Sequence, residues 1–188
     1  MIKVLFIGRP TREKGLFVLM RALMFLGRNS FSLTIVGDPP PELTVWRQRL
    51  HADTICCLGS VPNRHLPSII RRHDVLIVPS LYENFGNVAL EAMACGVPVV
   101  ASNTGGLSEL VRFGRGILFP TGNYRVLAAK LRILQQKKRQ RIQMGIVASI
   151  RVRRYGWLQI GAKVAQLLTE IASKHPPKCE NRRHTGHS

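Results

Sequence analysis

Two glutamates lie at a fixed spacing around a glycine turn. Seven residues separate Glu83 from Glu91, and Phe85, Gly86 and Asn87 fall between them. A helix beginning near these three residues would present the unpaired N–H groups of its first turn to an anion. Carboxylates accept hydrogen bonds from the hydroxyls of a sugar ring. The pattern therefore favours a diphosphate on the helix start, with glutamates holding hydroxyls on either side.

Basic residues in an earlier loop complement that anion site. Arg9 and Lys14 lie between Gly8 and Gly15, directly after an apolar run. Gly8 lets the backbone approach a ligand closely, and each cation can contact a diphosphate. The loop matches neither G-x-G-x-x-G nor the Walker A pattern, which disfavours nicotinamide and P-loop chemistry. Taken alone, it also fits an ordinary basic turn between a strand and a helix.

A third loop, which includes Gly59 and Val61, could border a flat base with its backbone groups, although alone it reads as an ordinary turn. The chain has only ten Asp and Glu in 188 residues. Two of them in one loop and helix favour a ligand-binding role over two solvated acids.

These loops need a scaffold that brings them together, and the apolar pattern supplies one. Short, nearly continuous apolar runs are typical of strands buried on both faces of a parallel sheet. The expected strands are 2–7, 32–36, 54–58, 75–78 and 97–101. The expected helices are 14–26, 66–72, 85–95 and 107–113, followed after Gly122 by helices only, marked by Leu127, Leu131 and Leu134 and by Ile160, Val164, Leu167, Leu168 and Ile171. This alternation predicts an α/β fold: a Rossmann-like, doubly wound parallel sheet with extra C-terminal helices, which binds ligands at the carboxyl ends of its strands.

The bulk composition limits the alternatives. We expect one domain over residues 1–173 and a basic, disordered tail over 174–188, where apolar periodicity stops. No apolar run approaches the length of a membrane span. The four cysteines form no C-x-x-C pair and are expected to be reduced thiols of a cytoplasmic protein, with no metal.

The net charge of +18 is concentrated in the C-terminal third. Residues 125–188 contain 15 Lys and Arg against two Asp and Glu. Such an excess favours anionic partners, so docking on the cytoplasmic face of an anionic membrane stands beside a merely solvated basic face. A specific nucleic-acid partner is not expected, because only 6% of the residues are aromatic and no stacking platform is evident.

Residues 82–102, which contain Glu83 and Glu91, resemble the E-x7-E signature of the retaining GT-B glycosyltransferases of group 1. The segments 6–9 and 14–15 are similar to the first motif of that family. Further segments occur in the family's order: 34–38, 58–61, 104–106, 116–118 and 155–157, the last similar to an F-x-W motif. The resemblance extends over residues 2–172.

The resemblance implies a role for each position. Arg9 and Lys14 would neutralise the diphosphate of a nucleotide-sugar donor as it leaves, and Glu83 would hold the transferred hexosyl group. The donor would also contact Gly8, the backbone of residues 85–87, Glu91 at the ribose, and Gly59 to Val61 at the base. Relatives are generally independent of metals, so no cofactor is implied.

GT-B enzymes react in the cleft between two Rossmann-like domains, and the resemblance places this chain in the second. It therefore predicts a C-terminal donor-binding domain that depends on an acceptor-binding N-terminal domain, in cis or in trans. The alternative is a non-catalytic nucleotide-sugar-binding or interaction module on the same fold.

Overall fold

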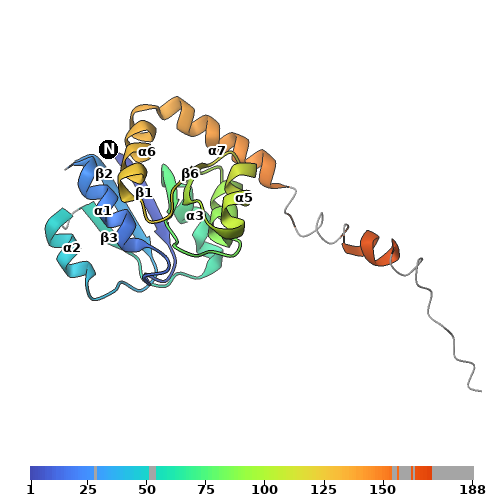
Figure 1. The fold of residues 1–188 in the computed structure, drawn as a ribbon, viewed down its shortest axis with the longest axis horizontal. Coiled ribbons are helices and arrows are strands. Elements are labelled where there is room, and N and C mark those ends of the chain that lie inside the picture. The colour runs from blue at the N-terminus through green and yellow to red at the C-terminus, as the bar shows by residue number, and fades with distance from the viewer. Residues whose placement is uncertain (28, 51–53, 154–155, 157–161, 163, 171–188) are drawn as a thin grey trace, which may run out of the picture. The chain divides into compact units, whose positions relative to one another are not determined.

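A computed structural model describes residues 1–27, 29–50, 54–153, 156, 162 and 164–170. The chain divides into two units, Met1–Arg153 and Arg154–Ser188. The first unit carries the fold (Figure 1). In the second, residues 164–170 are helical. The predicted tail, Tyr155, Trp157 and the ends of the last predicted helix lie outside the described residues.

The first unit is built on a six-stranded parallel sheet, which confirms the predicted fold class. The strand order is β3-β2-β1-β4-β5-β6, so the order reverses between β1 and β4. The strands are β1 (Ile2–Ile7), β2 (Phe31–Val36), β3 (Ile55–Cys57), β4 (Val75–Val78), β5 (Val99–Ser102) and β6 (Ile117–Phe119). β1 pairs with β2 along its whole length and with β4 through Val4 and Leu5.

Helices cover both faces of this sheet. They are α1 (Leu16–Leu26), α2 (Leu43–Leu50), the 3-10 turn η2 (Asn63–His65), α3 (Leu66–Ile70), α4 (Asn87–Ala94), α5 (Gly105–Phe113), α6 (Tyr124–Gln136) and α7 (Lys138–Val152). Crossovers between parallel strands are right-handed. The chain passes from β1 to β2 toward one edge of the sheet and from β4 to β5 toward the other. The helices that follow these two strands, α1 and α4, therefore lie on opposite faces.

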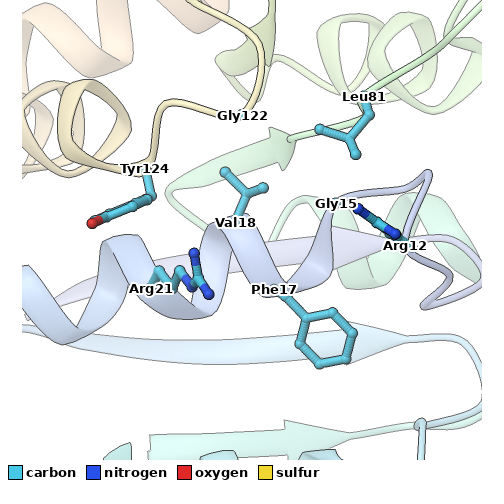
Figure 2. A pocket seen from close by; sticks show the side chains of 8 residues that line it. All are labelled: Arg12, Gly15, Phe17, Val18, Arg21, Leu81, Gly122 and Tyr124. Atoms are coloured by element: carbon cyan, nitrogen blue, oxygen red, sulfur yellow. The ribbon is translucent and has the colours of Figure 1, made fainter.

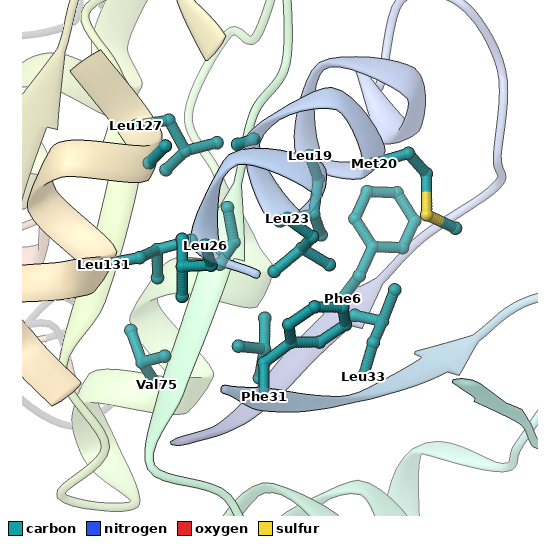
Figure 3. Close-up of a cluster of buried hydrophobic side chains, with 14 of the residues drawn as sticks. Phe6, Leu19, Met20, Leu23, Leu26, Phe31, Leu33, Val75, Leu127 and Leu131 are labelled. Atoms are coloured by element: carbon teal, nitrogen blue, oxygen red, sulfur yellow. The ribbon is translucent and has the colours of Figure 1, made fainter. Parts of the chain in front are cut away.

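The main hydrophobic core lies between the sheet and the helices α1 and α6. Phe6 of β1 is buried against Leu19 and Leu23 of α1, and Leu127 and Leu131 of α6 extend the same cluster (Figure 3). These leucines recur at the helical period, which is why the sequence pattern located both helices. The strand β4 is buried along all four of its residues.

Apart from η2, three elements were not predicted as such. β6 has only three residues and α2 buries only its terminal leucines, so neither produces a readable pattern. α7 buries Arg141, Gly145, Ala148 and Val152. This buried face consists of small residues and an arginine. The large apolar residues of α7 lie on its exposed face instead, so their spacing does not mark the buried side of the helix.

Candidate functional site

A cavity of about 330 Å³ opens at the switch point between β1 and β4, at the carboxyl edge of the sheet. Ligands of doubly wound sheets bind at this place, because the loops leaving the two strands diverge there. Its lining comes from the end of β1, the following loop, the end of β4 and the start of α4. These residues are Phe6, Ile7, Gly8, Lys14, Ile77, Val78, Pro79, Ser80, Glu83, Asn84, Phe85, Gly86, Asn87 and Val88.

Lys14 and Glu83 form an ion pair in this cavity. The Nζ atom of Lys14 donates a hydrogen bond of 2.7 Å to an Oε atom of Glu83, and Ser80 Oγ donates to the same oxygen at 3.4 Å. The side chain of Lys14 is 35% exposed and that of Glu83 18%. Both charges therefore remain within reach of a ligand entering from solvent.

The loops that carry these two charges are locked together through their backbones. Gly15 has a φ of +69°, and a Cβ atom there would collide with the carbonyl oxygen of Pro79. Beyond this contact, the N–H of Leu81 donates a hydrogen bond of 2.7 Å to the carbonyl of Glu13. The positions of Lys14 and Glu83 are thus coupled by contacts on either side of the ion pair.

Glycines also shape the start of α4. Gly86 caps the helix in the left-handed region, with φ +86°, and no side chain caps the first turn. On the other side, Gly105 and Gly106 of α5 approach the carbonyls of Glu83 and Asn84 so closely that a Cβ would collide with them. The first turn of α4 therefore offers backbone N–H groups to the cavity, as an anion site requires.

Three of the predicted residues, Arg9, Gly59 and Val61, lie beside the cavity without lining it. Gly37, after β2, approaches the carbonyl of Gly8, and its N–H donates to the carbonyl of Gly59 at 2.8 Å. The loop of Gly59 and Val61 is thereby held next to the first loop. Arg9 follows Gly8 directly, and its side chain is exposed and does not line the cavity.

Glu91 lies on a different surface from Glu83. It lines a second hollow, of about 340 Å³, with Arg71 of the turn after α3 and with Cys95 at the end of α4. Desolvation of the carboxyl raises the pKa of Glu91, and that of the Cys95 thiol is raised mainly by the same cause. The E-x7-E spacing thus places its two acids at two neighbouring hollows rather than in one.

A third hollow, of about 390 Å³, extends along α1 from the loop of Arg12 and Gly15 to the start of α6 (Figure 2). Arg12, Gly15 and Leu81 lie at one end of this hollow, and Tyr124, at the start of α6, lies at the other. Arg21 lies over the Tyr124 ring, 5.8 Å from its centroid. Gly15 therefore contributes both to this hollow and to the contact that joins the loops of Lys14 and Glu83.

The structure brings six of the predicted residues into one cavity: Gly8, Lys14, Glu83, Phe85, Gly86 and Asn87. Sequence reasoning missed Ser80, which follows the buried strand β4 after Pro79 and donates a hydrogen bond to Glu83. Its place at a strand end was the available signal. Within the part of the chain that the structure describes, no three His, Cys, Asp or Glu residues cluster as metal ligands. None of the described helices combines the length and apolar character of a membrane span.

Known proteins resemble both the sequence and the fold. The family model for glycosyl transferases group 1 matches residues 2–137. The D-inositol 3-phosphate glycosyltransferase of Pseudarthrobacter chlorophenolicus is 34% identical over 182 residues, which cover 92% of this chain and 43% of that protein.

Solved structures agree. Sucrose-phosphate synthase from Thermosynechococcus elongatus superimposes with a TM-score of 0.82 at 29% identity, covering 92% of this chain and 46% of that one. HepE from Anabaena was solved with UDP and with UDP-glucose, and the two structures superimpose with TM-scores of 0.82 and 0.80 at 27% identity, covering 90% of this chain and 49% of HepE.

The fold is therefore the Rossmann-like α/β architecture found in GT-B glycosyltransferases, and the chain spans about half the length of the three relatives named above. The matched family segment contains β1 to β6, the cavity and all of the predicted site residues. On this evidence the chain belongs to the glycosyl transferases group 1 family.

Proposed function

We propose that this chain binds a nucleotide-diphosphate sugar in the cavity at the switch point and supplies the donor half of a retaining hexosyl transfer. The observation that carries the proposal is the Lys14–Glu83 ion pair beside the start of α4, whose first turn no side chain caps. One surface there holds a cation, backbone donors and a carboxylate. The cation and the backbone N–H groups suit a diphosphate, and the carboxylate suits a sugar hydroxyl.

Donor binding exchanges the ion pair for contacts with the ligand. The diphosphate binds Lys14 and the N–H groups at the start of α4, and Glu83 then accepts a hydrogen bond from a hydroxyl of the sugar. Because the exchange replaces one charge-assisted contact with others, neither charge is left desolvated and alone. Ser80, which donates to Glu83, keeps the carboxylate oriented during this exchange.

Transfer requires the bond between the anomeric carbon and the diphosphate oxygen to break. Negative charge then develops on the diphosphate, where Lys14 and the positive end of the α4 dipole stabilise it. Arg9, on the same loop, supplies a second cation once the donor is in place. This division of labour needs no metal ion, because the protein's own positive groups neutralise the leaving group.

The remaining predicted residues hold the nucleoside. Gly59 and Val61 border the base from the loop after β3, which Gly37 ties to the first loop. Glu91 accepts hydrogen bonds from the ribose hydroxyls, reached from the hollow next to the cavity. UDP is the first nucleotide to test, since HepE was solved with UDP and UDP-glucose.

The acceptor-binding site must be supplied by a second domain that faces the carboxyl edge of the sheet, in cis or in trans. The relatives it resembles are about twice as long as this chain. We place the reaction in the cytoplasm, because Cys56, Cys57 and Cys95 are free thiols and disulfides are rare in that compartment.

Isothermal titration calorimetry with UDP, UDP-glucose and uridine tests the proposal. We expect UDP-glucose and UDP to bind and uridine to bind far more weakly, because the diphosphate contacts carry the affinity. Release of UDP from UDP-glucose, with and without an added acceptor domain, separates a catalytic half from a non-catalytic binding module. No heat with UDP-, GDP- or ADP-sugars at millimolar concentration would instead favour the interaction module.

A further inference from the structure

The helix α7 has two faces of opposite use. Its inner face packs on the body of the unit through Arg141, Gly145, Ala148 and Val152, all buried. Its outer face carries three isoleucines that remain open to solvent: Ile142 is 51% exposed, Ile146 48% and Ile150 59%. Large apolar side chains at this exposure, repeated along one helix, are unusual on a surface with no function.

The isoleucines form one continuous stripe flanked by cations. They recur every fourth residue, which places them above one another on the same side of a helix. Arg139 precedes Ile142 by three residues and Arg153 follows Ile150 by three, so both arginines fall at the ends of the same stripe. Both are exposed, and the sequence of α7 contains no Asp or Glu.

We propose that the outer face of α7 docks on an anionic lipid bilayer, with Ile142, Ile146 and Ile150 among the headgroups and the arginines on lipid phosphates. A helix of 15 residues is about 22 Å long and can lie flat in the interface. The absence of any acid on α7 removes the repulsion that an anionic surface would otherwise meet. This inference is independent of the proposed glycosyl transfer.

The position of α7 argues against a second glycosyltransferase domain as the partner that covers its exposed isoleucine face. Its Gly145 packs so closely on the turn of Gly96 and Pro98 that a Cβ would collide with the Gly96 carbonyl. That turn leads into β5 from its amino end, whereas the cavity opens at the carboxyl edge. A domain that completes the cavity therefore meets the opposite edge of the sheet.

Hydrogen bonds fix α7 to the rest of the first unit. Arg141 donates one hydrogen bond of 2.8 Å to the carbonyl of Leu134 and another of 2.7 Å to Asp74, which precedes β4. Asp74 also accepts the backbone N–H of Lys3 at 2.8 Å. These contacts join α7 to the amino ends of β1 and β4, so the outer stripe is presented on a fixed support.

Vesicle co-sedimentation of the full chain tests the proposal, with phosphatidylcholine vesicles that contain or lack phosphatidylglycerol. The net charge of +18 alone would attract the protein to anionic lipid, so the informative variant keeps the charge. We expect I142Q/I146Q/I150Q to lower the partition coefficient about tenfold at roughly 0.5 M salt, where screening leaves mainly the apolar contribution. The matched control is M24Q/V45Q, whose two side chains are each 47% exposed on other helices, and it should bind as the wild type does.

A second variant, R139Q/R153Q, should reduce the preference for phosphatidylglycerol while retaining the apolar contribution at high salt. Circular dichroism verifies that each variant is folded, which is expected since the substituted side chains point outward. The proposal is overturned if the isoleucine variant binds like the wild type, or if the control loses as much affinity. It is equally overturned if wild-type binding vanishes at high salt, or if the isoleucine substitutions change the oligomeric state and leave lipid binding intact.

Discussion

Lys14 and Glu83 are 69 residues apart in the sequence, yet their Nζ and Oε atoms lie 2.7 Å from each other at the switch point of the sheet. The first loop and the loop after β4 therefore share one charge-neutral contact. Because both loops are also joined through Gly15 and Leu81, each side chain is presented by a rigid base. Replacing either residue leaves the other charge without its partner, and under the proposed function it also removes a contact to the donor.

Substitution of Lys14 should separate diphosphate from nucleoside recognition. Lys14→Ala removes a cation from the diphosphate site but no contact from the nucleoside side, so UDP affinity should fall about tenfold or more while uridine affinity changes little. Calorimetry with both ligands measures the difference. Lys3→Ala is the matched control, since Lys3 is exposed near the amino end of β1, the strand that precedes the loop of Lys14. Equal losses for UDP and uridine, or no loss for UDP, would contradict the assignment of Lys14.

Substitution of Glu91 tests the ribose contact. Glu91→Ala should weaken UDP binding by about 1–3 kcal/mol, because hydrogen bonds to a carboxylate are lost. Glu91→Gln adds a pH test: desolvation raises the pKa of Glu91 above its usual 4.5, and the ionised form is the better acceptor. Wild-type affinity should therefore begin to fall, on acidification, at a pH above 4.5.

The ratio of wild-type to Glu91→Gln affinity is the quantity to follow, since protonation of the ligand's own phosphate affects both proteins alike. We expect this ratio to shrink as the pH decreases. A ratio that stays constant across the titration would remove Glu91 from the nucleotide site while leaving the cavity of Lys14 and Glu83 in place.

Two glycines with left-handed backbones should respond differently to alanine. Gly15 and Gly96 have φ of +69° and +77°, but only Gly15 has an atom, the Pro79 carbonyl oxygen, in the path of a Cβ. Gly96→Ala should cost about 1–2 kcal/mol for its backbone conformation. Gly15→Ala should cost at least about 1 kcal/mol more, because two loops must move apart. Urea denaturation measures both, and equal midpoints would show that the contact with Pro79 does not constrain the loops.

His73 should make folding sensitive to mild acid. Its ring nitrogens lie 2.8 Å from the Ile69 carbonyl and 2.8 Å from Thr34 Oγ1, and burial is the main cause of a pKa lowered from 6.5. Below that value the unfolded chain binds more protons than the folded one at this site. The free energy of unfolding should therefore decrease as the pH falls from 6.5 toward the lowered native pKa.

His73→Gln removes this titration. Chemical denaturation at several pH values should give a flatter dependence for the variant in the window just below pH 6.5, with no difference in slope above it. Identical slopes for the two proteins in that window would mean that His73 is not held neutral by the fold.

The strands show how far the sequence could be read. The runs 2–7 and 75–78 coincide with β1 and β4, because residues buried on both faces of a sheet must nearly all be apolar. α4 begins two residues later than predicted, at Asn87, since Gly86 adopts a left-handed cap that forms part of the cavity instead of the helix.

The site could be predicted only in part. Lys14 and Glu83 were assigned to one ligand, and the structure brings them together; that they pair with each other depends on the approach of Gly15 to Pro79, which no local pattern encodes. The separation of Glu91 into another hollow likewise follows from packing of α3 on α4. α7 was missed because Arg141 satisfies its buried hydrogen bonds where a leucine would have given a pattern.

The close seat of Gly145 on the turn before β5 fixes the direction in which the cavity points. A strand of six residues such as β1 spans about 20 Å, and the cavity lies at its far end from that turn. If the protein docks on lipid through α7, the cavity faces away from the bilayer and opens to water. A second substrate would then have to reach the cavity from the aqueous side. It would be either a dissolved molecule or a lipid headgroup on a linker at least as long as the strands.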